Sequence, residues 1–373
     1  MFFSSGFSYD PDPLKACQEA FEKALEKFDT RPKNKEILGM IFMSPKYDPQ
    51  QVMEFFKDID FIGLTTSGNI SLSGEYKGER SGITVNIIDK RQVYCETFSA
   101  SVMSRRPREI GNMIAERFKN PFNSSIILFA CPFYDVSEIL TGIGENSDIH
   151  VSGGIASSDR NRPIFIFENG SIGSYMIGGV FIEGVRTRHR IFQTCKIVGE
   201  NFLITSAYEN IIEEIEGIEA EDFIWGVSPI IEDPEAMESS WFIALPIDEN
   251  QEIYKFIPVA EIHDGKIFLF EKIETGKIAK LAFLSRDFAK NSAESETNAL
   301  PEDTDFCLFV NCVARSTMVG KNDVSTINKR KKSKSLKFEM SGFLSNGEII
   351  TLKKPTLLTY TGVLSLFSRM TIM

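Results

Sequence analysis

The sequence predicts a mixed α/β protein made of two tandem, related domains, in which helices pack on mixed sheets. Two observations favour this class. An apolar strand, an intervening segment and a glycine-rich loop occur in the same order three times along the chain. The chain also has 373 residues, which is too long for one typical hydrophobic core, so two domains are expected.

The three copies of this pattern are short. Their apolar runs occupy residues 37–42, 126–130 and 306–310, and their loops begin at Gly63, Ser152 and Gly342. The first and third loops align without a gap over 63–70 and 342–349, whereas the second has a Gly-Gly turn. Glycine after a strand lets backbone approach backbone or ligand closely, and successive free N–H groups there can bind an anion. The repeat therefore indicates a duplicated module whose strand ends face a shared pocket.

Helix starts and turns divide the rest of the chain. Asp12-Pro13 and Asp48-Pro49 each provide an N-cap aspartate followed by proline at the first helical position. The runs 83–88 and 92–98 are predicted to form a hairpin around the charged residues between them. The runs 163–172 and 178–183 are expected to be hairpin-like strands joined at Asn169-Gly170, and His263-Asp-Gly265 is predicted as a turn.

Composition limits the class of protein. The formal net charge of -11 argues against a general binder of nucleic acid or anionic membrane. No apolar run approaches the roughly 20 residues of a membrane-spanning helix, and the first residues do not resemble a signal peptide. The six cysteines include no C-x-x-C pair, which is typical of reduced thiols. We therefore expect a soluble protein of the cytoplasm.

Several segments together resemble the FIST family of sensory modules. They are residues 12–25, 62–70, 153–156, 199–223, 310–315 and 341–349. The resemblance implies an N-terminal FIST region over 1–218 and a C-terminal FIST region over 219–373, together with a role in signal transduction. It also implies a small-molecule ligand, and a separate signalling partner such as a histidine kinase or a diguanylate cyclase, because the two regions account for the whole sequence.

The glycine loops supply the candidate ligand site. Its predicted residues are Thr65, Thr66, Ser67, Gly68, Gly153, Gly154, Cys312, Arg315, Ser345, Asn346 and Glu348. Hydroxyls and glycine N–H groups beside Arg315 can bind a carboxylate, and Glu348 can take an ammonium group, so an amino acid is the expected kind of ligand. The alternative interpretation is that the loops are tight turns and that Arg315 and Glu348 form an internal ion pair.

Other functions are open at this stage. Some FIST proteins are regarded as haem-based sensors of nitric oxide, and His150 is then the best placed ligand, ahead of His189 and His263. No other cofactor is predicted. No catalytic motif is present, so an enzyme is not expected, although Cys131 or Cys312 can be considered as a nucleophile. A protein-interaction scaffold is a further alternative.

A basic segment contrasts with the acidic composition of the chain. It comprises Lys329 to Lys332, Lys334 and Lys337. The plainer interpretation is a solvated loop or helix face. The functional interpretation is a docking surface for an acidic partner.

Overall fold

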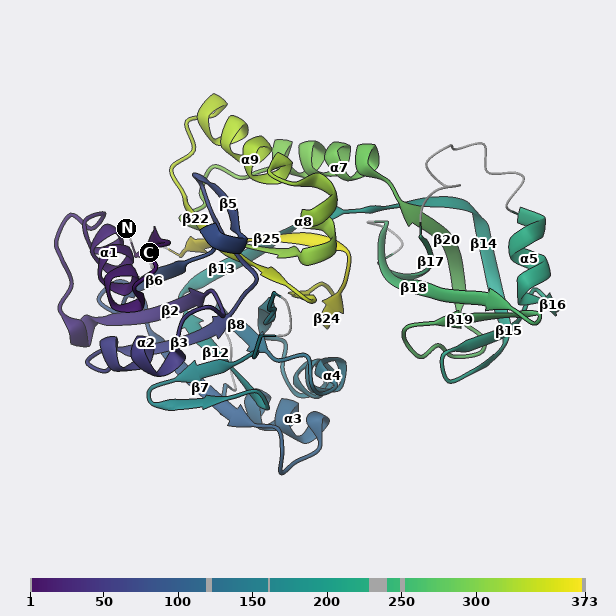
Figure 1. Ribbon diagram of the computed structural model, residues 1–373, viewed down its shortest axis with the longest axis horizontal. Coiled ribbons are helices and arrows are strands. Elements are labelled where there is room, and N and C mark those ends of the chain that lie inside the picture. The colour runs from purple at the N-terminus through teal and green to yellow at the C-terminus, as the bar shows by residue number, and fades with distance from the viewer. Residues whose placement is uncertain (1, 119–122, 160–161, 228–239, 249–251, 371–373) are drawn as a thin grey trace. The chain divides into compact units, whose positions relative to one another are not determined.

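The computed structural model describes residues 2–118, 123–159, 162–227, 240–248 and 252–370. The chain forms two compact units (Figure 1). Unit 1 comprises residues 1–192, 293–357 and 361–373, and unit 2 comprises residues 193–292 and 358–360. The predicted mixed α/β class is confirmed. The units divide the chain elsewhere than after residue 218, because the chain leaves unit 1 after residue 192 and re-enters it inside α7 (Arg286–Asn298).

Unit 1 contains three βαβ modules. The first comprises β2 (Ile37–Met43), α2 (Pro49–Phe55) and β3 (Asp60–Thr65). The second comprises β8 (Ser124–Ala130), α4 (Val136–Asn146) and β9 (His150–Ile155). The third comprises β21 (Phe306–Cys312), α8 (Val313–Val319), α9 (Asn322–Ser333) and β22 (Glu339–Ser345). The repeat read from the sequence is therefore a triplication, and the second copy is a full counterpart of the others.

A glycine occupies the same position in each module. The two strands of each module pair in parallel, and in the ladders Gly63 lies opposite Ile41, Gly153 opposite Leu128, and Gly342 opposite Phe309. A Cβ atom at any of these glycines would be too close to the carbonyl oxygen of the residue opposite. The three glycines are thus required by the approach of one strand to its neighbour.

Each module is the centre of a six-stranded sheet with the same order of strands. The first sheet adds β1 (Phe3–Ser8), β6 (Ile83–Asp89), β10 (Ile166–Glu168) and β11 (Ser171–Gly173), in the order β1-β6-β2-β3-β10-β11. The second adds β7 (Cys95–Ser101), β12 (Met176–Glu183), β23 (Glu348–Thr351) and β24 (Pro355–Leu358), in the order β7-β12-β8-β9-β23-β24. The third adds β13 (Val185–Gln193), β25 (Thr361–Arg369), β4 (Gly68–Ser71) and β5 (Gly74–Lys77), in the order β13-β25-β21-β22-β4-β5.

The sheets exchange strands in a cycle. The strand after each glycine loop leaves its own module and pairs antiparallel with the second parallel strand of another. β4 follows the loop of the first module and pairs with β22 of the third, β23 follows the loop of the third and pairs with β9 of the second, and β10 follows the loop of the second and pairs with β3 of the first. Unit 1 is therefore built with an approximate threefold relationship between its sheets.

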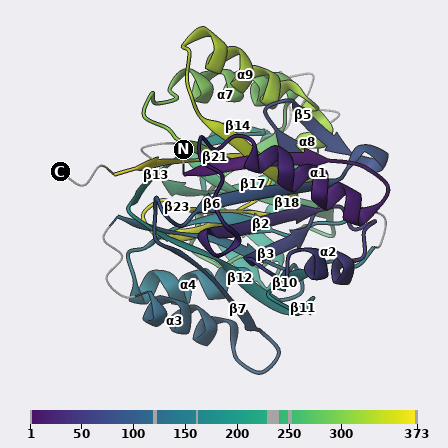
Figure 2. The same cartoon turned by 90° about the vertical axis from the view of Figure 1, so that its left-hand side faces the viewer.

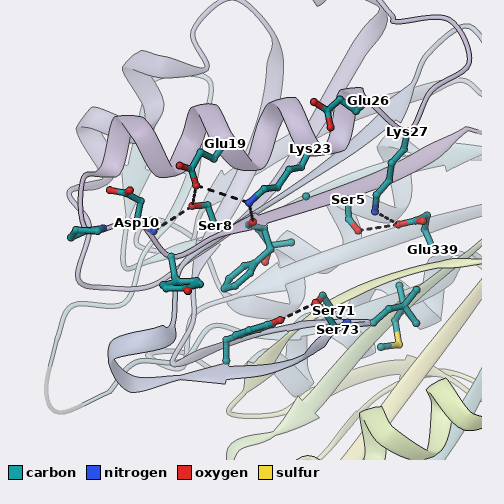
Figure 3. Close-up of a pocket in the computed structure, with 18 residues that line it drawn as sticks. Ser5, Ser8, Asp10, Glu19, Lys23, Glu26, Lys27, Ser71, Ser73 and Glu339 are labelled. Atoms are coloured by element: carbon teal, nitrogen blue, oxygen red, sulfur yellow. Dashed lines mark hydrogen bonds and ion pairs between the residues drawn. The ribbon is translucent and has the colours of Figure 1, made fainter.

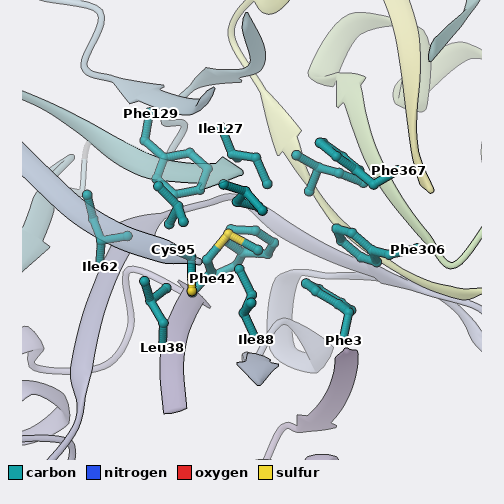
Figure 4. Close-up of a cluster of buried hydrophobic side chains, with 14 of the residues drawn as sticks. Phe3, Leu38, Phe42, Ile62, Ile88, Cys95, Ile127, Phe129, Phe306 and Phe367 are labelled. Atoms are coloured by element: carbon teal, nitrogen blue, oxygen red, sulfur yellow. The ribbon is translucent and has the colours of Figure 1, made fainter. Parts of the chain in front are cut away.

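The core of unit 1 lies between the three sheets. The central strands of all three modules contribute side chains to one cluster, among them Phe42, Phe129 and Phe306 (Figure 4). Each sheet has a second hydrophobic cluster on its other face. α1 (Pro13–Leu25) and α2 cover the first sheet, α3 (Pro107–Arg117) and α4 the second, and α9 the third. Figure 2 shows these helices on three different sides of the unit.

The predicted helix starts are confirmed. The Asp12 carboxylate accepts a hydrogen bond from the backbone N–H of Lys15, and the Asp48 carboxylate accepts one from Gln50. Proline occupies the first turn of both helices, where its missing N–H costs nothing.

The predicted hairpins are confirmed only in part. The hairpin over 83–98 is wrong, because β6 pairs with β1 and β2 whereas β7 pairs with β12 in another sheet. The chain does turn at residues 90–92, directly after β6, but this turn leads from one sheet to the next. Asn169-Gly170 joins β10 to β11 with positive φ at both residues, as predicted, and 178–183 belongs to a different sheet, within β12.

Unit 2 is a closed antiparallel barrel. Six strands pair in a ring in the order β14, β20, β17, β18, β19 and β15, because β15 also pairs with β14. Their bounds are β14 (Cys195–Tyr208), β15 (Ile211–Ile215), β17 (Trp241–Asp248), β18 (Ile253–His263), β19 (Lys266–Leu269) and β20 (Ile278–Leu284), and β16 (Ile218–Glu219) and α5 (Ala220–Val227) follow β15. The predicted turn at residues 263–265 connects β18 to β19.

Candidate functional site

The three glycine loops meet at one place in unit 1. The Thr66 and Ser157 hydroxyls both donate hydrogen bonds to the carbonyl oxygen of Leu344, at 2.9 and 2.5 Å. The backbone N–H of Ile155 donates to the Ser345 hydroxyl at 3.1 Å, and the Asn346 amide donates to the carbonyl oxygen of Ala156 at 3.0 Å. The structure thus brings together the loops that the sequence placed around one site.

Most polar groups of these loops bind one another. The side chains of Thr65, Thr66 and Ser345 are at most 1% exposed, and the residues Gly68, Gly153 and Gly154 are buried as well. Gly154 pairs with Glu348 in the ladder between β9 and β23. Among the predicted loop residues, Ser67 is half-buried and Asn346 is exposed. The junction of the loops is therefore a hydrogen-bonded structural element, and only Ser67 and Asn346 among these loop residues are accessible from outside it.

The two charged residues of the predicted site have different partners. Arg315 in α8 donates from Nε and Nη2 to the two carboxylate oxygens of Asp323 in α9, each at 2.9 Å. Glu348 in β23 accepts a hydrogen bond from the Thr361 hydroxyl at 2.7 Å. Burial raises the pKa of Glu348 well above its usual range, and the Thr361 hydrogen bond and the charge of Arg315 offset part of this rise. Cys312 lies at the start of α8 and is buried.

A cavity of about 650 Å³ opens beside the loop junction. We call it the rim pocket. Its charged lining residues are Lys46, Lys77, Glu79, Asp159 and Arg162, and its hydroxyl-bearing residues are Ser44, Ser67 and Thr317. A volume of this size falls within the range of small-molecule sites. Ser67 is the one predicted site residue that lines this pocket.

The fold explains why the pocket lies here. Ser44 follows β2, Ser67 lies just beyond β3, Asp159 lies beyond β9, and Val313 follows β21. The pocket is therefore outside the carboxyl ends of parallel strands from all three modules. In open α/β sheets, ligands bind in the crevice at this end of the strands.

Positive groups outnumber negative ones in the rim pocket. The Lys46 ammonium donates to the carbonyl oxygen of Glu79 at 3.2 Å, and its pKa is lowered by burial and then by the positive charge of Arg162. The Lys77 ammonium lies 2.7 Å from the Glu75 carboxylate and 3.1 Å from the carbonyl oxygen of Ser316. The carboxylates of Asp159 and Glu79 raise the pKa of Lys46 and so offset part of that lowering, and Asp159 lies 4.0 Å from Arg162. The three cations and two carboxylates that line the pocket leave an excess of positive charge.

A larger groove of about 1070 Å³ runs along the edge strand β1 (Figure 3). Lys23 reaches over the strand and donates to the carbonyl oxygen of Phe7 at 3.1 Å, and Lys27 pairs with Glu339 at 2.7 Å. Glu19 accepts a hydrogen bond from Ser8 at 2.7 Å. Lysines placed on an exposed strand edge prevent pairing with other chains. The charged groups of this groove thus serve the fold, and the rim pocket is the better candidate for a ligand site.

None of the three histidines lines the rim pocket or the groove along β1. His150 is exposed at the start of β9. The Nδ1 atom of His189 lies 3.1 Å from the Ser365 hydroxyl, and burial lowers the pKa of His189 to about 3. His263 is in unit 2, where its ring stacks on Phe268 with the ring centroids 4.5 Å apart. Within the described ranges, no group of three or more metal-ligating side chains occurs.

The cysteine side chains are all buried. Burial raises the pKa of the Cys131 thiol to about 12 and that of Cys307 well above its usual range. A thiol of this kind is a weak nucleophile at neutral pH, because the thiolate is the reactive form.

Comparison with known families gives a match over part of the chain. The model of the FIST N domain matches residues 37–218. None of the curated proteins compared with this chain matches it. In the part of the chain that the structure describes, no helix has both the length and the apolar character needed to cross a membrane.

Proposed function

Because residues 37–218 form a FIST N domain, a sensory domain of signal-transduction proteins, we propose that this protein is a cytoplasmic sensor that binds a small molecule in the rim pocket. The resemblance of residues 219–373 to the C-terminal FIST region supports the same role. In this proposal the protein is not an enzyme. It passes its signal to a separate partner, such as a histidine kinase or a diguanylate cyclase.

One observation carries the proposal. Three cationic side chains, Lys46, Lys77 and Arg162, line one cavity together with Ser67 of the first glycine loop. The cavity also contains the carboxylates of Glu79 and Asp159. A zwitterion such as an amino acid would place its carboxylate near the cations and its ammonium group near these acids. In an acidic amino acid, the second carboxylate would pair with the remaining positive charge of the pocket.

Isothermal titration with a panel of amino acids tests the proposal. The panel contains glutamate, aspartate, glycine, leucine, lysine and arginine. We expect at least one of them to bind, and we expect Lys46→Gln and Arg162→Gln each to weaken binding about tenfold or more, since hydrogen bonds to charged groups contribute about 1.5–3 kcal/mol.

Lys57→Gln is the matched control, because Lys57 is exposed and pairs with Glu54, outside the rim pocket. Its affinity should equal that of the wild type. The proposal is wrong if no member of the panel binds, or if both pocket variants bind as well as the control.

Haem binding is the alternative cofactor hypothesis. Purified protein supplemented with haem should show a Soret band that disappears in His150→Ala if His150 is the axial ligand. A spectrum unchanged by this substitution rules out His150. A scaffold without a ligand is the remaining alternative, and it predicts that the amino-acid panel and haem both fail to bind.

A further inference from the structure

The basic segment seen in the sequence divides into two groups in the structure. Arg330 donates to the carbonyl oxygen of Asn298 at 2.7 Å, and the Lys331 ammonium lies 5.2 Å from the centroid of the Phe338 ring. These two side chains stabilise α9 against its neighbours. The other members, Lys329, Lys332, Lys334 and Lys337, are exposed. We call these four residues the lysine surface.

The lysine surface has no internal counter-charge among the residues that the structure covers. Many other exposed cations of unit 1 do pair, such as Lys15 with Asp10 and Lys57 with Glu54. Cations in the last turn of a helix interact favourably with its dipole, which accounts for Lys332. It does not account for Lys334 and Lys337, which lie beyond the end of α9.

α8 connects the lysine surface to the rim pocket. Val313 and Thr317 of α8 line the pocket. The Arg315–Asp323 pair joins α8 to α9. A second connection comes from β5, where Glu75 accepts a hydrogen bond from the Ser316 hydroxyl of α8 and forms an ion pair with the pocket residue Lys77, each at 2.7 Å.

We propose that the lysine surface docks an acidic segment of a partner protein, and that α8 couples this docking to occupation of the rim pocket. The docking rests on the charges of the lysine surface, and the coupling rests on the proposed ligand site. By thermodynamic linkage, the ligand changes the affinity for the partner by a certain factor, and the partner changes the affinity for the ligand by the same factor.

The overall charge selects a polypeptide over a membrane as the partner. A membrane surface would meet a chain with a net charge of -11, which anionic lipids repel. A short acidic segment contacts only the four lysines and avoids this repulsion.

Fluorescence anisotropy with a labelled peptide of ten glutamates tests the docking. Wild type should bind at low salt, and the variant with Lys329, Lys332, Lys334 and Lys337 changed to Gln should bind about tenfold more weakly or worse, given that exposed charge pairs contribute modestly one by one. The control changes four other exposed lysines, Lys35, Lys57, Lys272 and Lys353, to Gln and has the same net charge. Equal losses in both variants would overturn the docking, as would binding to phosphatidylserine vesicles without binding to the peptide.

Hydrogen exchange tests the coupling with the same peptide. Saturating peptide should slow exchange of the α8 amides, residues 313–319, by about fivefold or more, the lower end of typical allosteric coupling. Protection of α9 with no change in α8 would remove the coupling and leave the docking intact. Because both measurements use the peptide alone, failure of the amino-acid panel to bind would not be confused with failure of the lysine surface.

Discussion

Arg315 and Asp323 form a bidentate ion pair that is fully buried, with the side chains 0% and 1% exposed. The pair joins α8 to α9. A buried charge that loses its partner remains desolvated, so removing one member of such a pair is costly.

Asp323→Ala should therefore destabilise the protein by about 3–5 kcal/mol. Urea unfolding followed by circular dichroism measures the change. Glu54→Ala is the control, since Glu54 and Lys57 form an exposed pair, and such pairs contribute little. A similar shift of the unfolding midpoint in both variants would contradict the special role of the buried pair.

Glu348 should make stability depend on pH. Burial raises the pKa of this carboxyl in the folded protein, so the folded state keeps a proton that the unfolded chain releases at the ordinary value of about 4.3. The carboxyl of Glu348 therefore contributes to the stability of the folded protein below about pH 4.3, and this contribution is lost as pH rises through the folded-state pKa. Glu348→Gln keeps the hydrogen-bonding shape of the neutral acid and should gain stability relative to wild type as pH rises above the ordinary carboxyl pKa of about 4.3. Urea unfolding across this range would refute the assignment if the two stability profiles ran parallel.

Gly342→Ala should be strongly destabilising. The added methyl group would overlap the carbonyl oxygen of Phe309 in the parallel ladder, and strands cannot separate without losing their hydrogen bonds. Overpacking of this kind costs about 3 kcal/mol. Gly226→Ala is the control, because that glycine lies in α5 with open space around it, and alanine should stabilise the helix by up to about 1 kcal/mol. Thermal unfolding that places Gly342→Ala at or above wild type would show that β21 and β22 can move apart.

The native cysteines should react slowly with a thiol reagent. At pH 8, a thiol such as Cys131 with a pKa of about 12 has a thiolate fraction about three orders of magnitude below that of a free cysteine. We expect colour release from Ellman's reagent only over hours in the native protein, and from all six thiols at once in guanidinium chloride. Rapid reaction of one thiol in the native state would instead indicate an activated cysteine and would revive the enzyme hypothesis.

Local signals in the sequence predicted local structure well. Asp12 and Asp48 cap the helices they were expected to cap, and Asn169-Gly170 turns where its backbone preference demands. These features depend on residues within a few positions of one another. β1 was missed because four of its six residues are serine or glycine, and only its pairing with β6 makes them part of a sheet.

Long-range pairing was beyond the reach of the sequence pattern. Asn69 lies opposite Phe343 in the ladder between β4 and β22, and a four-residue strand contains no signal for so distant a partner. In the candidate site, too, the local features were predicted and the long-range contacts were not. The glycine loops were found because glycine marks close approach, whereas Lys46, Lys77 and Arg162 are brought together only by the fold. Their position near strand ends is the signal that could have identified them.

The cycle of exchanged strands has a consequence for how the chain is made. A fragment ending near residue 218 would include the matched FIST N domain but lack β22 and β23, so β4 and β9 would each have an unpaired edge. In the nascent chain, the edges of β4 and β9 stay unpaired until residues 339–351 have been synthesised. For β4, this is about 270 residues later in the chain. Unpaired strand edges of this kind make incompletely folded chains prone to aggregation. Unit 1 can therefore complete its sheets only after residues 339–351 have been synthesised.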